Sequence, residues 1–556
     1  MGLSRVIFFQ KIFTRDEKKK LIGFNIFNLL VNALDIGFLG LLLWIINFYS
    51  KPKPYKISLG HWVLENQSSS LLIFFVLLFI LKNFLGFLHL ERRNKFFFSI
   101  ATRISKESLL EYLHQEFSRF IEEDSSIQIR KISQEPIEFI TYILMNVQEV
   151  ITQIITIFFT LAGIAWYNSK LFLGLFLLLL PPLILLNYFS RKKLQHLRKG
   201  IKISSEKSLQ TLREALDSFI ISNIQNKRIF FQNRYLPYQK ELNGYLALNQ
   251  SLQGLPTRFL EVFAVLGYGV LQWILTLYKP TEVNLILETG IFLTASYKII
   301  PGIVKIMNSL SQLKTYSFTI EDLSPKNARK GYTPYSEKKP LQRISFREVN
   351  FQFEKKPILV NQSFEIEKGN FLVLTGKSGS GKTTLVNLIL GLLSEDKGEI
   401  YFNKEKSNAE NRKEYWPSMA YVNQDSFIFQ DTISKNIILS DEVQDPKSFE
   451  NLVQIPFMQE FIGQLENGLE TQVWENGKNL SGGQKQRIML ARALYRDFDL
   501  LILDEAFSEL DEGSGLTILN NLKELTKKDK MILFITHNPN YFRFGDKLIN
   551  LNNQNS

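Results

Sequence analysis

The chain has 556 residues, enough for more than one domain, and a formal net charge of +12. It contains no Cys and 5 His, which excludes disulfides, thiolate catalysis and Cys-ligated metals and argues against structural zinc. The basic residues surround apolar segments and form no stripe interleaved with aromatics. An anionic membrane surface explains this distribution better than nucleic acid, and we expect no nucleic-acid partner.

The N-terminal segment at 1–20 is basic but has no small-residue cleavage site, so we expect no signal peptide. Apolar segments of membrane length, about 20 residues each, follow it. They predict an α-helical membrane domain with six spans, near 21–48, 69–91, 137–166, 171–190, 255–278 and 286–310. Pro181 and Pro182 predict a kink or a re-entrant bend in the fourth span.

Basic residues gather in the N-terminal segment and in the connections 92–135 and 191–250. The positive-inside rule therefore places both termini and these two connections in the cytoplasm. Both connections carry apolar residues at helical spacing, which predicts membrane helices that continue as long cytoplasmic extensions.

Between the first two spans, residues 55–65 mix aromatic and aliphatic residues with polar ones. They predict a short interfacial helix on the outer face, with a plain surface loop as the alternative. After Tyr316 the sequence loses its apolar period. We therefore predict a transmembrane domain at 1–316, a linker at 317–340 and a soluble α/β P-loop ATPase domain at 341–556.

Residues 376–383 match the glycine-rich phosphate-binding loop, placed between a predicted strand and a predicted helix. Backbone N–H groups of such a loop and the helix N-terminus bind phosphate oxygens. Lys382 would add a positive charge and Thr383 a hydroxyl for Mg²⁺, so ATP and Mg²⁺ are the expected cofactors. The predicted phosphate-binding residues are Gly376, Lys377, Ser378, Gly379, Ser380, Gly381, Lys382, Thr383 and Thr384.

Two further apolar strands are predicted to end in polar residues suited to hydrolysis. The segment LLILDE at 500–505 ends in Asp504, which would hold Mg²⁺, and Glu505, which would polarise the attacking water. The segment MILFITH at 531–537 ends in His537, which would contact the γ-phosphate and orient Glu505.

The segment at 480–484 precedes another predicted helix and consists of Leu480, Ser481, Gly482, Gly483 and Gln484. Together with the loop and the Asp-Glu pair, it resembles the signature of the ATP-binding cassette (ABC) transporter family. The resemblance covers the whole chain, as a six-span exporter-type half followed by one cassette. It implies an ATPase coupled to transmembrane movement of a substrate.

The same resemblance assigns further roles. It implies that Phe353 stacks on adenine, that Gln424 contacts Mg²⁺ together with Thr383 and Asp504, and that Asp511 lies at a dimer contact. The signature would act in trans on a nucleotide held by a second cassette, which implies a homodimer with two equivalent sites. Residues near 118–128 and 222–232 would be coupling helices. Trp474, in TQVWENG, stands where the family commonly has Gly.

Five charged residues lie within the predicted spans: Asp35, Lys82, Arg258, Lys298 and Lys305. Intramembrane charge is costly, so we place these residues on the translocation path, where the basic ones suit an anionic headgroup. The segments LPTRFLE and SYKIIPGIVKI resemble elements of bacterial lipid-linked oligosaccharide flippases. This implies a polyprenyl-pyrophosphate glycan substrate in the bacterial inner membrane, although Lys replaces Arg in the second segment and loses bidentate phosphate geometry.

Other interpretations stay open. Arg258 and Glu261 could form an intrahelical ion pair, and Lys82 and Lys305 could extend along the helix surface to the interface. An exporter of peptides or amphipathic compounds is the alternative function. An ATPase without transport is disfavoured because six predicted spans precede the cassette.

Overall fold

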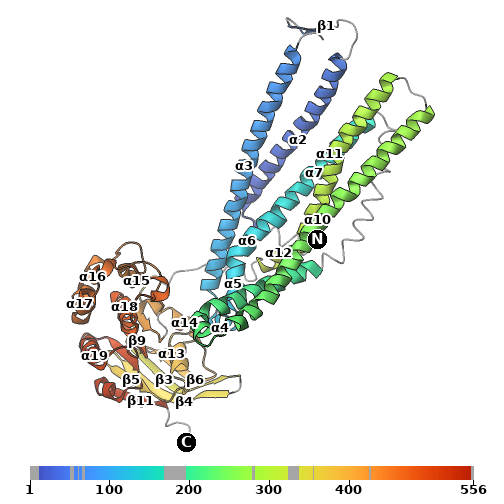
Figure 1. The fold of residues 1–556 in the computed structure, drawn as a ribbon. Coiled ribbons are helices and arrows are strands. Elements are labelled where there is room, and N and C mark those ends of the chain that lie inside the picture. Colours follow the sequence, from blue (N-terminus) through green and yellow to red (C-terminus); the bar gives the residue numbers. More distant parts are fainter. Residues whose placement is uncertain are drawn as a thin grey trace. The chain divides into compact units, whose positions relative to one another are not determined.

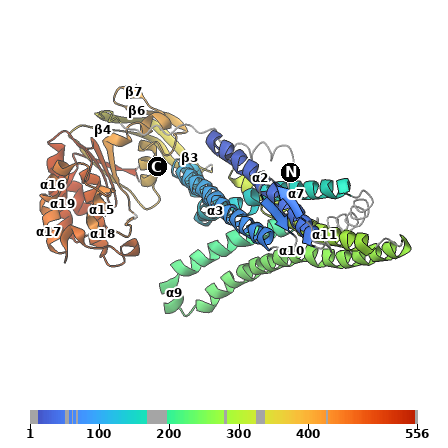
Figure 2. The same cartoon turned by 90° about the horizontal axis from the view of Figure 1, so that it is seen from above.

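The computed structural model describes residues 12–49, 56–59, 62–65, 69–167, 196–278, 282–323, 337–354, 356–424 and 427–551. The chain divides into a helical unit, residues 1–115 and 121–329, and a second unit, residues 330–556 together with 116–120, of which 330–556 are called the α/β unit; the helical and α/β parts are treated separately below. Figures 1 and 2 show the elements of both units. The predicted fourth span, with Pro181 and Pro182, lies outside the described residues.

The long helices in the described part of the helical unit are α2 (Arg15–Tyr49), α3 (Ser70–Leu113), α7 (Met145–Tyr167), α10 (Arg228–Tyr278) and α11 (Glu282–Thr315). Residues 196–217 form a further helix. The short elements are α4 (Phe117–Glu122), α5 (Ser125–Ile129), α6 (Glu135–Glu138), α9 (Phe219–Ile224), α12 (Phe318–Asp322) and the π-helical segments η1 (Arg130–Gln134) and η2 (Phe139–Leu144).

Several helices are longer than a membrane requires. With 44 and 51 residues, α3 and α10 are about 66 and 77 Å long, against a hydrocarbon thickness of about 30 Å. The structure therefore confirms that helices continue well past the predicted second and fifth spans.

Three helical stretches in the described part of the chain are long and apolar enough to cross a membrane: Arg15–Leu42, Ser70–Leu113 and Ser125–Ala165. Their apolar side chains point outward to an unusual degree. Phe74, Leu77 and Ile80 of α3 are each more than half exposed. Such a surface suits lipid rather than water. The total of six spans stays a prediction.

The prediction of an interfacial helix at 55–65 is wrong. Lys56–Leu59 (β1) and Trp62–Glu65 (β2) pair as antiparallel strands, with Leu59 opposite Trp62. The register leaves two residues, Gly60 and His61, between the strands. Two segments of β-forming residues separated by two residues that include Gly are a sequence pattern typical of a β-hairpin. This pattern, rather than the apolar content that suggested a helix, is the correct guide for this segment.

The start of the predicted linker at 317–340 is helical in the structure. The five residues of α12 lie within it, and Phe318 and Ile320 are buried together with the preceding Tyr316. They pack in a core that includes Phe97 of α3 and Phe139 of η2. The beginning of the predicted linker is therefore part of the helical unit.

The described strands of the α/β unit form two sheets. The antiparallel sheet has the order β4–β3–β6–β7, and the parallel sheet has the order β11–β5–β10–β9–β8. The strands are β3 (Arg343–Phe353), β4 (Lys356–Glu367), β5 (Phe371–Thr375), β6 (Lys397–Phe402), β7 (Glu405–Lys406), β8 (Met419–Val422), β9 (Leu500–Asp504), β10 (Met531–Ile535) and β11 (Lys547–Asn550). The helices are α13 (Lys382–Ile389), α14 (Ala409–Lys413), α15 (Ile433–Ile438), α16 (Pro446–Val453), α17 (Pro456–Gly463), α18 (Gly482–Tyr495) and α19 (Glu512–Thr526), with short 3₁₀ turns η3 (Trp416–Ser418), η4 (Gly468–Glu470), η5 (Glu475–Gly477) and η6 (Pro539–Phe544).

The parallel sheet separates two hydrophobic cores. Successive side chains of a strand point to opposite faces, so Phe371 and Val373 of β5 enter one core while Leu372 and Leu374 enter the other. The first core also contains apolar residues of α15–α19, and the second contains those of α13 and of the antiparallel sheet. Every residue of β5, β9 and β10 is buried, as expected for parallel strands covered on both faces.

Candidate nucleotide-binding and hydrolysis site

The phosphate loop connects the end of β5 at Thr375 with the start of α13 at Lys382. Gly379 and Gly381 have φ values of +78° and +93°, a region that favours glycine. A Cβ atom at Gly381 would also lie 2.7 Å from Leu359 Cδ2. The backbone path therefore requires glycine at these two positions.

The polar groups of this loop are suited to an anion. Lys382 is 8% exposed, and its Nζ donates to the carbonyl oxygens of Gly376 (3.0 Å) and Lys377 (3.2 Å). The buried hydroxyl of Ser380 has no hydrogen-bond partner among the described residues. The phosphates of ATP could accept hydrogen bonds from both groups: the Lys382 ammonium, which now donates to loop carbonyls, and the Ser380 hydroxyl just before a helix N-terminus.

Three side chains predicted to act in hydrolysis lie together. Glu505 Oε1 is 2.9 Å from His537 Nε2, and Gln424 Nε2 donates to Glu505 Oε2 over 3.0 Å. They follow the carboxyl ends of β9, β10 and β8, which are neighbours in the parallel sheet. Glu505 has a φ of +50°, and its N–H donates to the carbonyl of Ile535. The backbone and two neighbouring side chains thus fix the position of this carboxylate.

Asp504 lies beside this group and is only 5% exposed. Burial and the charge of Glu505 raise the pKa of Asp504 to about 6, although Lys382 and a hydrogen bond from Tyr421 oppose the shift. Tyr421 was not predicted as a site residue. It precedes Gln424 in YVNQD, but only the pairing of β8 with β9 brings it near Asp504.

The oxygen donors present fit Mg²⁺. Thr383, Asp504 and Gln424 offer a hydroxyl, a carboxylate and an amide oxygen, which are hard ligands of the kind that Mg²⁺ prefers. The residues that the structure describes contain no group of three or more His, Cys, Asp or Glu side chains that could hold a metal alone. A Mg²⁺ ion here would therefore share its coordination with the nucleotide phosphates.

The raised pKa of Asp504 predicts an unusual effect on stability. Because the folded protein binds this proton more tightly than the unfolded chain, stability is lost as pH rises from about 4 to 6. In the absence of Mg²⁺ and nucleotide, Asp504→Asn should therefore stabilise the ATPase unit at pH 7, by up to about 3 kcal/mol. The gain should shrink toward pH 4. Melting curves of both proteins between pH 4 and 7 measure it.

Asp497 provides a control of opposite sign. A hydrogen bond from Lys338 lowers the pKa of Asp497, so its contribution to stability is present at neutral pH and lost in acid. Asp497→Asn should lower the melting temperature at pH 7 and have little effect at low pH. Equal destabilisation by Asp504→Asn at every pH would show that burial does not raise the pKa of Asp504.

The predicted signature forms the start of α18. Ser481 is its N-cap and accepts a hydrogen bond from Gln484 N–H (3.2 Å), while Gln484 Oε1 accepts one from Ser481 N–H (2.9 Å). A Cβ atom at Gly482 would lie 2.7 Å from Glu509 Oε2. The capping box holds the exposed Ser481 at a helix N-terminus that can receive an anion.

Two other predicted residues lie at the surface of this unit. Phe353 ends β3 and is 51% exposed, with its ring centroid 6.2 Å from that of Phe351. Asp511 is the N-cap of α19 and accepts a hydrogen bond from Ser514 N–H (2.8 Å), a contact that lowers its pKa. Their proposed roles toward adenine and toward a second cassette remain predictions.

Four of the five charged residues of the predicted spans have described side chains, and each of the four forms an ion pair. Lys82 forms an ion pair with Asp35, and its ammonium lies 4.8 Å from the centre of the Phe79 ring. Arg258 Nη1 is 3.4 Å from Glu261 Oε2, with the arginine side chain 84% exposed. Each basic group therefore has a carboxylate partner within its own chain.

The sixth predicted span contributes the remaining two lysines. Lys305 of α11 lies 3.2 Å from Glu149 of α7. Lys298 also belongs to α11, but its side chain is outside the described part of the chain.

Short helices occur at both predicted coupling positions. Near 118–128 lie α4 and α5, and near 222–232 lie α9 and the start of α10. Phe219, Ile220 and Ile224 of α9 are each more than two-thirds exposed. Such apolar ends fit a docking role, which remains a prediction.

Comparison with known proteins agrees with this architecture. The family described as ABC transporter matches residues 359–508. The chain is 37% identical over 235 residues to an ATP-dependent lipid A-core flippase of Vibrio vulnificus (strain CMCP6), which covers 42% of the chain. The match spans only 40% of the flippase's own length. An export ATP-binding/permease protein of Rickettsia bellii (strain RML369-C) is 28% identical over 510 residues, covering 86% of the chain and 84% of that protein.

A solved structure of a bacterial Atm1-family ABC exporter with ATP bound superimposes with a TM-score of 0.74 at 19% identity. It covers 97% of this chain and 93% of the other. The long apolar helices and the shared fold make the chain a multi-pass membrane protein. The phosphate loop, the signature helix and the family match at residues 359–508 identify the ATPase domain of an ABC transporter, and the whole chain has a fold similar to that of an ABC exporter half-transporter.

Proposed function

We propose that the chain forms a homodimer in the bacterial inner membrane, with its ATPase units cytoplasmic, and uses ATP hydrolysis to export or flip a substrate. The observation that carries the ATPase is the contact of Glu505 with both Gln424 and His537 beside the buried Asp504. One chain supplies one phosphate loop and one signature. Two chains would therefore supply two composite sites.

The roles of this chain's residues in hydrolysis follow from their contacts. Glu505, fixed on both oxygens, would accept a proton from water attacking the γ-phosphate. His537 and Gln424 would hold the carboxylate in line. Lys382 would turn from the loop carbonyls toward the phosphates, and bound Mg²⁺ would supply charge neutralisation.

We propose an anionic lipid-linked substrate, such as a polyprenyl-pyrophosphate oligosaccharide. The exposed Arg258, held only loosely by Glu261 at 3.4 Å, supports this choice because its guanidinium can exchange one partner for a phosphate. The similarity to proteins named lipid A-core flippases also supports a lipid.

Pairing of the other in-span charges favours a second candidate. Lys82 is neutralised by Asp35 and Lys305 by Glu149, which leaves little net positive charge among the described side chains of the spans. An exporter of peptides or amphipathic compounds would suit such a surface. ATPase stimulation by a lipid-pyrophosphate glycan, compared with a peptide panel in proteoliposomes, distinguishes the two.

Arg258 supplies the sharper test. Arg258→Ala should lower flipping of an anionic lipid by about tenfold or more and leave basal ATPase nearly unchanged, since a charge-assisted hydrogen bond is lost. Arg258→Lys should retain an intermediate rate, because the charge survives without the planar fork. Reconstituted flipping assays measure both.

Glu261→Ala is the matched control. If Arg258 serves only its ion pair, Arg258→Ala and Glu261→Ala should lower the melting temperature and transport together. Transport that follows stability across these variants would refute a substrate role for Arg258.

A further inference from the structure

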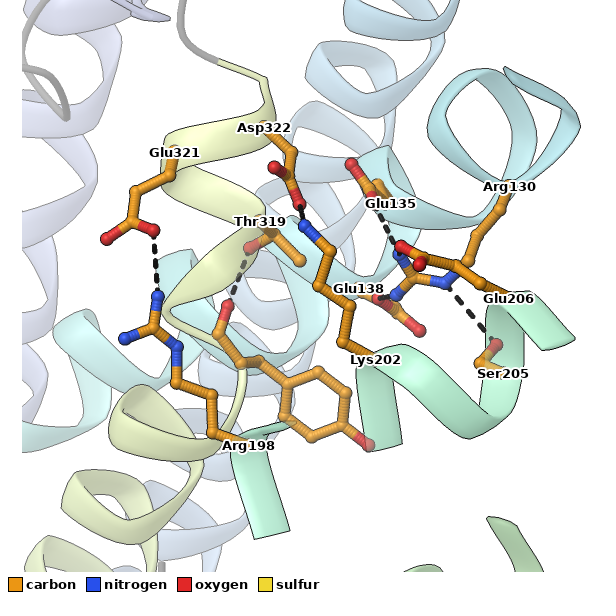
Figure 3. Close-up of polar contacts among 11 residues, drawn as sticks. Arg130, Glu135, Glu138, Arg198, Lys202, Ser205, Glu206, Thr319, Glu321 and Asp322 are labelled. Carbon is orange, nitrogen blue, oxygen red and sulfur yellow. Dashed lines mark hydrogen bonds and ion pairs between the residues drawn. The ribbon is translucent and has the colours of Figure 1, made fainter. Parts of the chain in front are cut away.

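A buried charged cluster lies in the helical unit, away from the ATP site (Figure 3). Arg130, at the start of η1, is 1% exposed and forms ion pairs with Glu135 and with Glu138, the latter at 2.9 Å. Its Nε donates to Ser205 Oγ over 3.3 Å, and Glu206 lies 3.9 Å away. A buried guanidinium surrounded by carboxylates thus connects the continuous helical stretch Ser125–Ala165, called the third helix below, to the helix at 196–217.

The same helix holds α12 by two further ion pairs. Lys202 Nζ lies 2.5 Å from Asp322 Oδ2, and Arg198 Nη2 lies 2.8 Å from Glu321 Oε2. Arg198 and Lys202 are one helical turn apart and point toward neighbouring acids of α12, as Figure 3 shows. The guanidinium of Arg130 also lies 4.9 Å from the centre of the Phe318 ring.

Apolar contacts fix α12 on its other side. The rings of Tyr316 and Tyr142 stack with centroids 3.8 Å apart. Tyr316, Phe318 and Ile320 are all buried. The short helix is thus held by packing and by charge, although five residues could not form a stable helix alone.

The segment that receives these contacts has an irregular backbone. The π-helical segments η1 and η2 flank α6, which carries Glu135 and Glu138. Each π-helical turn interrupts the regular hydrogen-bond register of a helix, and such turns often occur at functional positions. The charged cluster therefore lies where the third helix can bend or shift its register most easily.

We propose that α12 and these charged residues form a clamp that transmits displacement of the linker to the π-helical part of the third helix. The chain runs from α12 into the predicted linker and then into the ATPase unit, so any pull on the linker first reaches α12. The clamp makes α12, the helix at 196–217 and the third helix respond together. This inference rests on the proposed ATP-driven transport.

Charge exchange between Lys202 and Asp322 tests the clamp. Lys202→Asp and Asp322→Lys should each raise amide hydrogen exchange at 316–323 by about fivefold, since each places like charges together. The double variant should return to within about twofold of the wild type, because the pair is restored in reverse. Arg213→Asp is the matched control: Arg213 lies on the same helix and forms a surface ion pair with Asp217.

Transport per ATP hydrolysed, measured in proteoliposomes, tests the transmission itself. Both single variants should keep basal ATPase but move about threefold less substrate per ATP, and the double variant should recover. Unchanged exchange at 316–323 in both single variants would overturn the clamp. Faster amide exchange at 316–323 without a change in substrate moved per ATP would refute the proposal that the clamp transmits displacement of the linker. A wild-type protein that hydrolyses ATP but moves no tested substrate would refute the proposed function, while the exchange data would still decide the clamp.

Discussion

Glu505→Gln should lower ATP turnover by about a hundredfold or more, the scale expected for loss of a positioned general base. Glutamine can accept a hydrogen bond from His537 and, once the Gln424 amide turns to present its oxygen, donate one to Gln424, so the geometry should survive while the ability to accept a proton is lost. ATP binding should be retained, because the phosphate loop is untouched. Phosphate release and nucleotide binding, measured on the same preparation, separate these effects.

Glu524→Gln is the matched control for this substitution. Glu524 lies on the exposed surface of α19 and forms an ion pair with Lys527, one turn away. Its replacement should leave turnover unchanged. Near-wild-type hydrolysis by Glu505→Gln would refute the assignment of the general base.

Ser481→Arg and Lys382→Ala should each abolish hydrolysis, yet a mixture of the two should regain activity. The signature and the phosphate loop would act on one nucleotide from different chains, so a mixed dimer has one intact composite site. With random pairing, the mixture should recover about a quarter of the wild-type rate. Co-expressed variants carrying different affinity tags allow the mixed dimer to be isolated and assayed.

Lys527→Ala is the matched control for the lysine substitution, since Lys527 is the C-cap of α19 and its side chain is exposed. It should retain full activity. Isolated mixed dimers without hydrolysis, under conditions in which the wild type is active, would contradict two equivalent and independent sites.

The parts of the site that depend on local sequence could be predicted. The glycines at 379 and 381 are needed by the loop backbone, and Ser481 with Gln484 forms a capping box; both are determined within a few residues. The meeting of Glu505 with His537 was also predicted. It follows from two buried strands that end in polar residues at the same edge of a parallel sheet.

Features that depend on distant parts of the chain were missed. The pairing of Lys82 with Asp35 joins helices whose packing no local pattern specifies. Tyr421 reaches Asp504 only because β8 and β9 are neighbours, although more than 70 residues separate them in the chain. The helix α12 escaped detection because five residues carry too little periodicity, and its stability comes from Arg130, Lys202 and the surrounding core.

The alternation of side chains in the parallel sheet has a consequence for how the protein tolerates change. Leu501 and Leu503 of β9 face one core, whereas Leu500 and Ile502 face the other. The strand that ends in Asp504 thus packs against both hydrophobic cores. A cavity created in either core can therefore shift the same strand. Residues far from each other, on α17 and on the antiparallel sheet, therefore both help to position the carboxyl end of β9. Substitutions in either core are therefore limited by the need to keep Asp504 and Glu505 in position, although neither core contains those two side chains.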